Sequence, residues 1–173
     1  NDMERYNAAF VWEVKKFCER IALEVFFVEH RVFSAADVRR MKDVSFVASL
    51  TATMMSDYFH RDEEIESFLE RYDEEFGEVE QLQERFSHVF TAMNAMGFER
   101  GSRAWKKADF YTLFVEVDRI LHREEVNFNA EEAGTRLSTF VEQVDAHRHS
   151  EDAPAGDVGS YLRPTLQSTK AKT

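Results

Sequence analysis

The sequence has a single cysteine, only two prolines and no long apolar run. One cysteine, Cys18, cannot form an internal disulfide, which favours a reducing, cytoplasmic setting and a small core residue at this position. A membrane-spanning helix needs about 18 or more consecutive apolar residues, so none is expected. The start Asn1-Asp2-Met3-Glu4 lacks the basic residues of a signal peptide. The sequence therefore predicts a soluble, cytoplasmic protein with no membrane partner.

Basic residues are also scarce, since 22 Lys and Arg stand against 33 Asp and Glu for a net charge of -11. This excess of negative charge argues against the chain as a whole binding the phosphate backbone of a nucleic acid. The acidity is concentrated between Arg61 and Arg85, where eleven acidic side chains accompany three basic ones. We interpret this run as a solvated helix face, with a cation site or a mimic of nucleic acid as alternatives.

What the sequence does contain is helical periodicity. Apolar residues recur at steps of three and four almost throughout, which predicts an all-α bundle of about six helices. The expected helices cover residues 5 to 30, 35 to 58, 61 to 76 and 78 to 96, then a fifth from Asp109 and a sixth from Asn129. The pattern ends after His147. We therefore expect one helical domain over residues 1–148, followed by a linker and a disordered or weakly helical tail over 149–173.

Local signals predict several helix ends. Ser34 with Asp37 resembles a capping box, and Asp109 and Asn129 are placed to cap the fifth and sixth helices. Arg39 and Asp43, one turn apart, are expected to pair. The stretch Val25 to Val28 is apolar nearly all round, so it is either buried or a face awaiting a partner.

No familiar catalytic or metal motif occurs. The sequence has no Glu-x-x-His pair of the di-metal bundles, no zinc-finger cysteines and no phosphate-binding glycine loop. Two helical pairs, Glu84 with His88 and Asp118 with His122, could hold zinc if a third ligand came from elsewhere, but ordinary helix-surface pairs are favoured. We therefore predict no catalytic residue, no metal and no cofactor.

One compact basic cluster precedes the fifth helix. Its members are Arg100, Arg103, Lys106 and Lys107, with Trp105 among them. A basic loop with an aromatic residue can neutralise and stack on nucleic acid. On an acidic protein, such a loop more often pairs with the protein's own acidic helices, and we favour that interpretation.

Three stretches together resemble the helical C-terminal part of GmrSD-type proteins. They are Asn7-Ala8 before an aromatic helix, then Arg40-Met41-x-Asp43-Val44-x-Phe46-Val47, and last the basic loop leading into Asp109-Phe110-Tyr111-x-Leu113-Phe114. The likeness covers most of residues 5 to 122. GmrSD-type proteins carry an N-terminal ParB/sulfiredoxin-like nuclease domain and serve in restriction of modified DNA and in phage defence.

The resemblance implies an accessory role without activity in this chain. The family's Asp-Gly-Gln-Gln-Arg motif, which binds or hydrolyses nucleotide, and the His-Asn-His nuclease domain of some members are absent from the sequence. The expected partners are the nuclease domain of the same protein, DNA through the full-length protein, and a second copy in a homodimer. Only Arg40, Asp43, Asp109 and Tyr111 match family positions by type. For these four residues we favour structural roles, as an ion pair or cap that joins helices, over substrate contact.

A rival hypothesis from another class is a stand-alone, acidic helical interaction module. Its acidic helices would bind a basic partner protein or mimic DNA.

Overall fold

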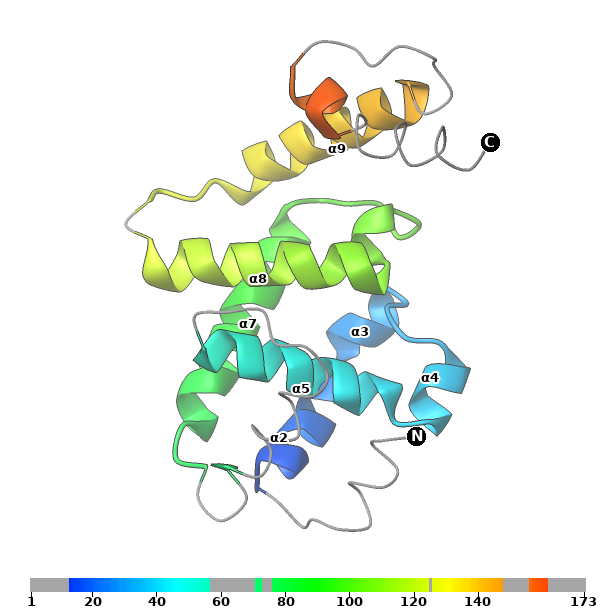
Figure 1. Ribbon diagram of the computed structural model, residues 1–173. Coiled ribbons are helices and arrows are strands. Elements are labelled where there is room, and N and C mark those ends of the chain that lie inside the picture. The colour runs from blue at the N-terminus through cyan, green and yellow to red at the C-terminus, as the bar shows by residue number, and fades with distance from the viewer. Residues whose placement is uncertain (1–12, 57–70, 73–75, 125, 148–155, 162–173) are drawn as a thin grey trace. The chain divides into compact units, whose positions relative to one another are not determined.

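A computed structural model describes residues 13–56, 71–72, 76–124, 126–147 and 156–161, and these are helical with no strand among them (Figure 1). The elements are α2 (Glu13–Ala22), α3 (Val25–Glu29), α4 (Ala35–Arg39), α5 (Lys42–Met55), α7 (Val79–Ala95), the 3-10 turn η1 (Arg103–Trp105), α8 (Lys107–Arg123) and α9 (Ala130–His147). The predicted all-α fold is confirmed. None of the described helices is both long and apolar enough to cross a bilayer. Asn7-Ala8 and most of the expected third helix lie outside the described residues.

The chain divides into two compact units. The first comprises Asn1–Asn94 with Glu99–Phe128, and the second comprises Ala95–Phe98 with Asn129–Thr173. The units interleave, because the second takes in residues 95–98 as well as everything after Phe128. The predicted helical domain over residues 1–148, with a linker and tail over 149–173, describes a different property of the chain and stays a prediction. The pattern shows where helical periodicity ends, but it does not show which helices pack together.

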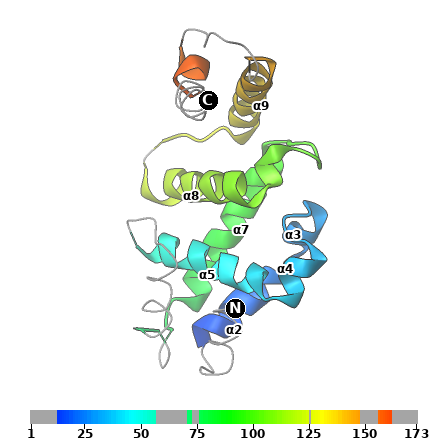
Figure 2. The same ribbon diagram turned by 45° about the vertical axis from the view of Figure 1, so that its right-hand side comes forward.

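Aromatic rings make up much of the core of the first unit. Phe26 of α3 stacks on Phe90 of α7 with ring centres 4.3 Å apart, and Phe17 of α2 meets Phe86 of α7 at 5.9 Å. Phe110 of α8 lies 5.8 Å from Phe27. Helices α5 and α8 both cross α7 (Figure 2). Each such ring pair adds about 0.5 to 1.5 kcal/mol beyond its buried area, so these contacts hold α2, α3, α7 and α8 together.

Cys18 is fully buried on α2, as the sequence predicted. Burial raises the pKa of its thiol to about 12. A weak contact with Thr51 lowers this pKa, but by less than burial raises it. The thiol is therefore a packing group at neutral pH.

The expected first helix is interrupted between α2 and α3. Glu24 has an extended backbone (φ -57°, ψ 137°), and this restart changes which side chains face inward. Phe26 and Phe27 are buried, whereas Val25 and Val28 are 64% and 70% exposed. The stretch is therefore buried on one side only, and whether its exposed side receives a partner stays a prediction.

The expected second helix is also divided, at Met41. Its backbone is left-handed (φ 52°), which ends α4 and starts α5 at Lys42. The capping box of α4 is confirmed, because the Ser34 hydroxyl accepts from the Asp37 N–H and the Asp37 carboxylate accepts from the Ser34 N–H. The predicted Arg39–Asp43 pair is wrong: Arg39 donates to the Ala35 carbonyl, because the break at Met41 destroys the one-turn spacing.

In the second unit, α9 begins as predicted, with the Asn129 side chain accepting from the Glu132 N–H at 3.1 Å. A helical turn over residues 157–161 follows, and its Val158 is buried with Val144 of α9. Gly134 lies directly against the Met96 backbone, where a Cβ atom would overlap. Its missing side chain allows α9 to approach the 95–98 segment closely.

Candidate functional site

A buried ion pair joins α7 to α8. The Asp118 side chain on α8 is almost completely buried and receives two hydrogen bonds from Arg85 on α7: Nε to Oδ1 at 3.1 Å and Nη2 to Oδ2 at 2.5 Å. This two-pronged geometry is the strongest way for an arginine to hold a carboxylate. The pair therefore fixes the relative position of the two helices.

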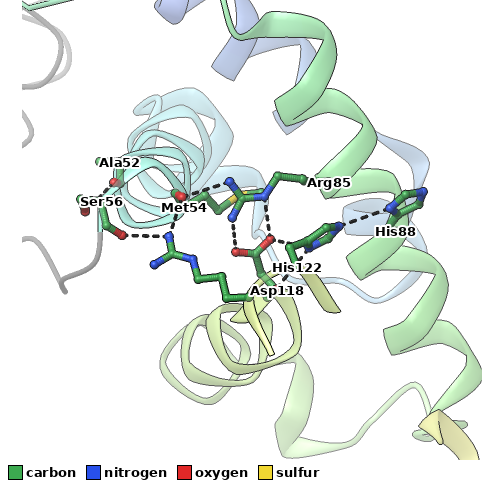
Figure 3. A network of polar contacts seen from close by, with 8 residues as sticks. Ala52, Met54, Ser56, Arg85, His88, Asp118 and His122 are labelled. Atoms are coloured by element: carbon green, nitrogen blue, oxygen red, sulfur yellow. Dashed lines mark hydrogen bonds and ion pairs between the residues drawn. The ribbon is translucent and has the colours of Figure 1, made fainter. Parts of the chain in front are cut away.

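Arginine side chains in the same region cap the C-terminal end of α5 (Figure 3). Arg85 Nη1 donates to the Met54 carbonyl at 3.1 Å, and Arg123 Nη2 donates to the Met54 and Ser56 carbonyls at 2.8 and 3.1 Å. The last carbonyls of a helix have no partner within the helix and carry its partial negative charge. Two guanidinium groups satisfy them here.

A histidine pair continues this network toward solvent. The His122 Nδ1 lies 3.1 Å from Asp118 Oδ1 and 3.2 Å from the Asp118 carbonyl, while His122 Nε2 lies 3.3 Å from Nδ1 of His88 on α7. The other nitrogen of His88, Nε2, is 3.8 Å from Glu84 Oε1. The two pairs that the sequence singled out separately are thus brought together.

A hollow of about 330 Å³ lies beside the histidines. It is lined by Gln81, Glu84, Arg85, His88, His122 and Arg123. Across the described part of the chain, no three His, Cys, Asp or Glu side chains converge on a common metal position. The sequence offered no signal for Arg85, because its partner Asp118 is 33 positions away.

The basic cluster is tied to the protein itself. Arg100 donates to the Glu29 carbonyl at 2.9 Å, Arg103 pairs with Asp109 at 2.9 Å, and Lys107 pairs with Asp37 at 2.7 Å. Lys106 is exposed. Pairing with the protein's own acidic and carbonyl groups, the interpretation that we favoured, accounts for three of the four cations.

Trp105 does not present its ring to a nucleic acid. It is buried, stacks on His30 with ring centres 3.8 Å apart, and donates its N–H to the Glu99 carbonyl at 2.9 Å. An exposed aromatic face is what base stacking requires. Trp105 therefore anchors the loop after α7 onto α3.

The four residues that the resemblance singled out, Arg40, Asp43, Asp109 and Tyr111, lie around α5 and α8. Arg40 is exposed beside the Met41 break, and Asp43 is buried at the start of α5 with its Oδ1 lacking a hydrogen-bond partner. Burial raises the pKa of Asp43. The buried Oδ1 is the one oxygen of this set that the surrounding helices leave unsatisfied.

Asp109 does not cap α8, because the cap position is Lys106. Asp109 instead lies in the first turn and accepts from Arg103. The Tyr111 hydroxyl lies 2.6 Å from Thr53 Oγ1 and donates to the Ser49 carbonyl at 3.3 Å. Burial raises the pKa of Tyr111, and the neutral hydroxyl joins α8 to α5.

A further ion pair, between Lys107 and Asp37, links α8 to α4. The hydrogen bond from Lys107, followed by those from Ser34, holds the pKa of Asp37 well below its usual range. The carboxylate is thus both half of a capping box and the counter-ion of a lysine 70 residues away.

Taken together, these contacts join the helices of an all-α fold to one another: Arg85–Asp118 joins α7 to α8, Tyr111–Thr53 joins α8 to α5, and Lys107–Asp37 joins α8 to α4. No protein-family model, curated protein or solved structure matches the chain.

Proposed function

We propose that this chain is the helical accessory part of a GmrSD-type DNA restriction and phage-defence protein. In this role it positions or regulates a nucleotide-dependent nuclease domain carried by another stretch of polypeptide, and has no activity alone. DNA and a second copy of the protein are partners through the full-length assembly.

The observation that carries the proposal is how the two described stretches of the resemblance meet. Phe46 of α5 lies 5.9 Å from the Phe110 ring and 5.8 Å from the Tyr111 ring of α8. Tyr111 also bonds to Thr53, and Lys107 to Asp37. These side chains hold α5, α4 and α8 together. A helical accessory domain needs such contacts, because they fix the positions of its helices and take part in no chemical reaction.

A second observation supports an intermolecular role. Leu23, Val25 and Val28, around the α2–α3 break, are 77%, 64% and 70% exposed. Val25 and Val28 lie one turn apart on α3, and Leu23 comes two residues before Val25. Exposed apolar side chains at neighbouring positions of this kind support a surface for another polypeptide. We assign this apolar surface, defined by these three residues, to the nuclease domain.

The enzymatic test compares two proteins. The purified 173 residues should neither hydrolyse nucleoside triphosphates nor nick DNA with Mg²⁺ present. The same residues joined to a domain that carries Asp-Gly-Gln-Gln-Arg should do both. Hydrolysis or nicking by the 173 residues alone would refute the proposal.

The docking test uses the apolar surface. Replacing Leu23 and Val28 by serine should abolish co-purification with the co-expressed nuclease domain while leaving the melting temperature unchanged, since both side chains are already in water. Val126→Ser is the matched control, because Val126 is 58% exposed but lies outside the surface. Equal retention of the nuclease domain by both variants would count against this surface.

A further inference from the structure

His88 of α7 and His122 of α8 form a hydrogen bond between two imidazole rings. The rings are nearly parallel (9°), with centres 5.5 Å apart, and His88 Nδ1 lies 3.3 Å from His122 Nε2. Figure 3 shows the His122 ring between Asp118 and His88. A hydrogen bond of this kind needs one nitrogen that carries a proton and one that offers a lone pair. The contact therefore depends on how many protons the two rings hold.

The partners of His122 determine which nitrogen is the acceptor. Its Nδ1 lies 3.1 Å from Asp118 Oδ1 and 3.2 Å from the Asp118 carbonyl oxygen. Arg85 donates to both carboxylate oxygens of Asp118, so these oxygens act as acceptors. His122 Nδ1 therefore carries a proton and Nε2 offers the lone pair. The donor of the bond between the rings is then Nδ1 of His88.

This arrangement has room for one added proton but not for two. The first can bind His88 Nε2, which takes no part in the contact and lies 3.8 Å from Glu84 Oε1. The second has to bind His122 Nε2, the acceptor of the bond. Two N–H groups would then face each other across 3.3 Å, and two positive rings would lie 5.5 Å apart. The contact therefore breaks when both rings are protonated.

The surrounding charges leave this repulsion in place. The pair faces Glu84 and Arg85 on α7 and Asp118 and Arg123 on α8, so two carboxylates and two guanidinium groups balance in number. Described residues of α5 contribute the carbonyl groups at its C-terminal end, to which both arginines donate. The His88 side chain is 55% exposed, so protons reach the pair from solvent.

We propose that the His88–His122 contact is a pH-sensitive switch between α7 and α8. The switch is closed while the pair holds at most one added proton, and it opens once both rings are protonated. Histidines in general change charge between about pH 5 and 8, so mild acid is the signal. Opening separates the two rings beside the hollow, while the buried Arg85–Asp118 pair still joins the helices. The switch is independent of the proposed accessory role, since it requires only the first unit.

The first test is urea unfolding of the 173-residue chain, followed by circular dichroism at about pH 7.5 and about pH 5. The unfolded chain can protonate both histidines, whereas the closed switch excludes one proton, so acid favours the unfolded and open states. The folded-to-unfolded ratio should fall about 3- to 30-fold more for wild type than for His88→Gln. The upper limit of about 30-fold corresponds to excluding one whole proton from an ordinary histidine at about pH 5.

Two comparisons separate the switch from a purely structural role. Loss of packing at His88 would lower the stability of its variant equally at both pH values, whereas the switch makes the difference depend on pH. His147→Gln is the matched control, because His147 hydrogen-bonds the Gln143 carbonyl one turn back on α9. This control should keep the pH dependence of wild type.

The second test follows the rings directly by nuclear magnetic resonance. A nuclear Overhauser effect between the ring protons of His88 and His122 should be present at about pH 7.5. It should disappear at about pH 5, where nitrogen-15 shifts report two N–H groups on each ring. The proposal is overturned if wild type and His88→Gln lose equal stability in acid, or if His147→Gln reduces that loss as much as His88→Gln. A ring-to-ring effect that is missing at about pH 7.5, or that persists with both rings fully protonated, also overturns it.

Discussion

Asp118 shows how one buried side chain can organise several helices. Its two oxygens accept from Arg85, one also faces His122, and Arg85 extends the network to the end of α5. A buried carboxylate is costly unless its partners are complete. We therefore treat Asp118 as the residue on which the joint of α5, α7 and α8 depends most.

Asp118→Asn should strongly destabilise the chain. The amide keeps the shape but removes the charge that neutralises Arg85, and breaking a buried ion pair costs about 3 to 5 kcal/mol. Urea unfolding followed by circular dichroism measures the loss. Asp157→Asn, an exposed aspartate, should change the free energy of unfolding by less than about 0.5 kcal/mol. Equal midpoints for the two variants would contradict the role given to Asp118.

Asp37 gives stability a dependence on acid pH. Its folded-state pKa lies below the unfolded value near 3.8, so its contribution is complete above that value and is lost as pH falls toward the folded pKa. Asp37→Asn should cost about 1 kcal/mol at pH 7, where the charged cap and its lysine partner are intact. The difference from wild type should shrink below pH 4 in urea titrations. A difference that stays constant down to pH 2 would disprove this linkage.

At the scale of helices, the sequence predicts features that depend on residues close together in the chain, such as helix caps. The capping residues Ser34 and Asn129 were found because cap and helix are adjacent in the chain. The breaks at Glu24 and Met41 were missed because neither has a glycine or proline to signal it. The packing of Phe26 and Phe27 against α7 and α8 overrides the uniform helical pattern there.

Gly134 tests the close packing of α9. Alanine normally favours a helix over glycine by about 1 kcal/mol, yet Gly134→Ala places a Cβ onto the Met96 backbone. We expect a net loss of about 1 to 3 kcal/mol, measured by thermal unfolding. Gly101→Ala is the control, since nothing lies within 4 Å of its added Cβ. A stabilised Gly134→Ala variant would mean that the 95–98 segment moves easily to make room for the added Cβ atom.

At the scale of the whole chain, the helical periodicity of apolar residues predicts the fold class but not the site. Glu84 with His88 and Asp118 with His122 were both visible as one-turn pairs, but nothing in the sequence indicated that they meet. Contacts between residues 33 or 34 positions apart depend on how α7 crosses α8, which one-dimensional spacing does not encode. The resemblance to GmrSD-type proteins stays a prediction.

The chain alone should bind DNA poorly. Its net charge is -11, and Arg103 and Lys107 of the basic cluster already pair with Asp109 and Asp37. In a fluorescence titration at about 150 mM salt, a duplex of roughly 30 base pairs should show a Kd no tighter than about 100 μM. Tighter binding that replacement of all four basic residues weakens would instead assign the DNA contact to this loop.

The burial of Cys18 has a practical consequence for following this protein in solution. Its only thiol is sequestered with a pKa of about 12, so maleimide reagents should leave the folded chain unmodified near pH 7. Cysteines introduced at exposed positions such as Lys42 and Arg136 would then be the sole attachment points for dyes. Energy transfer between them could report any movement on binding a partner, with the native thiol left in place.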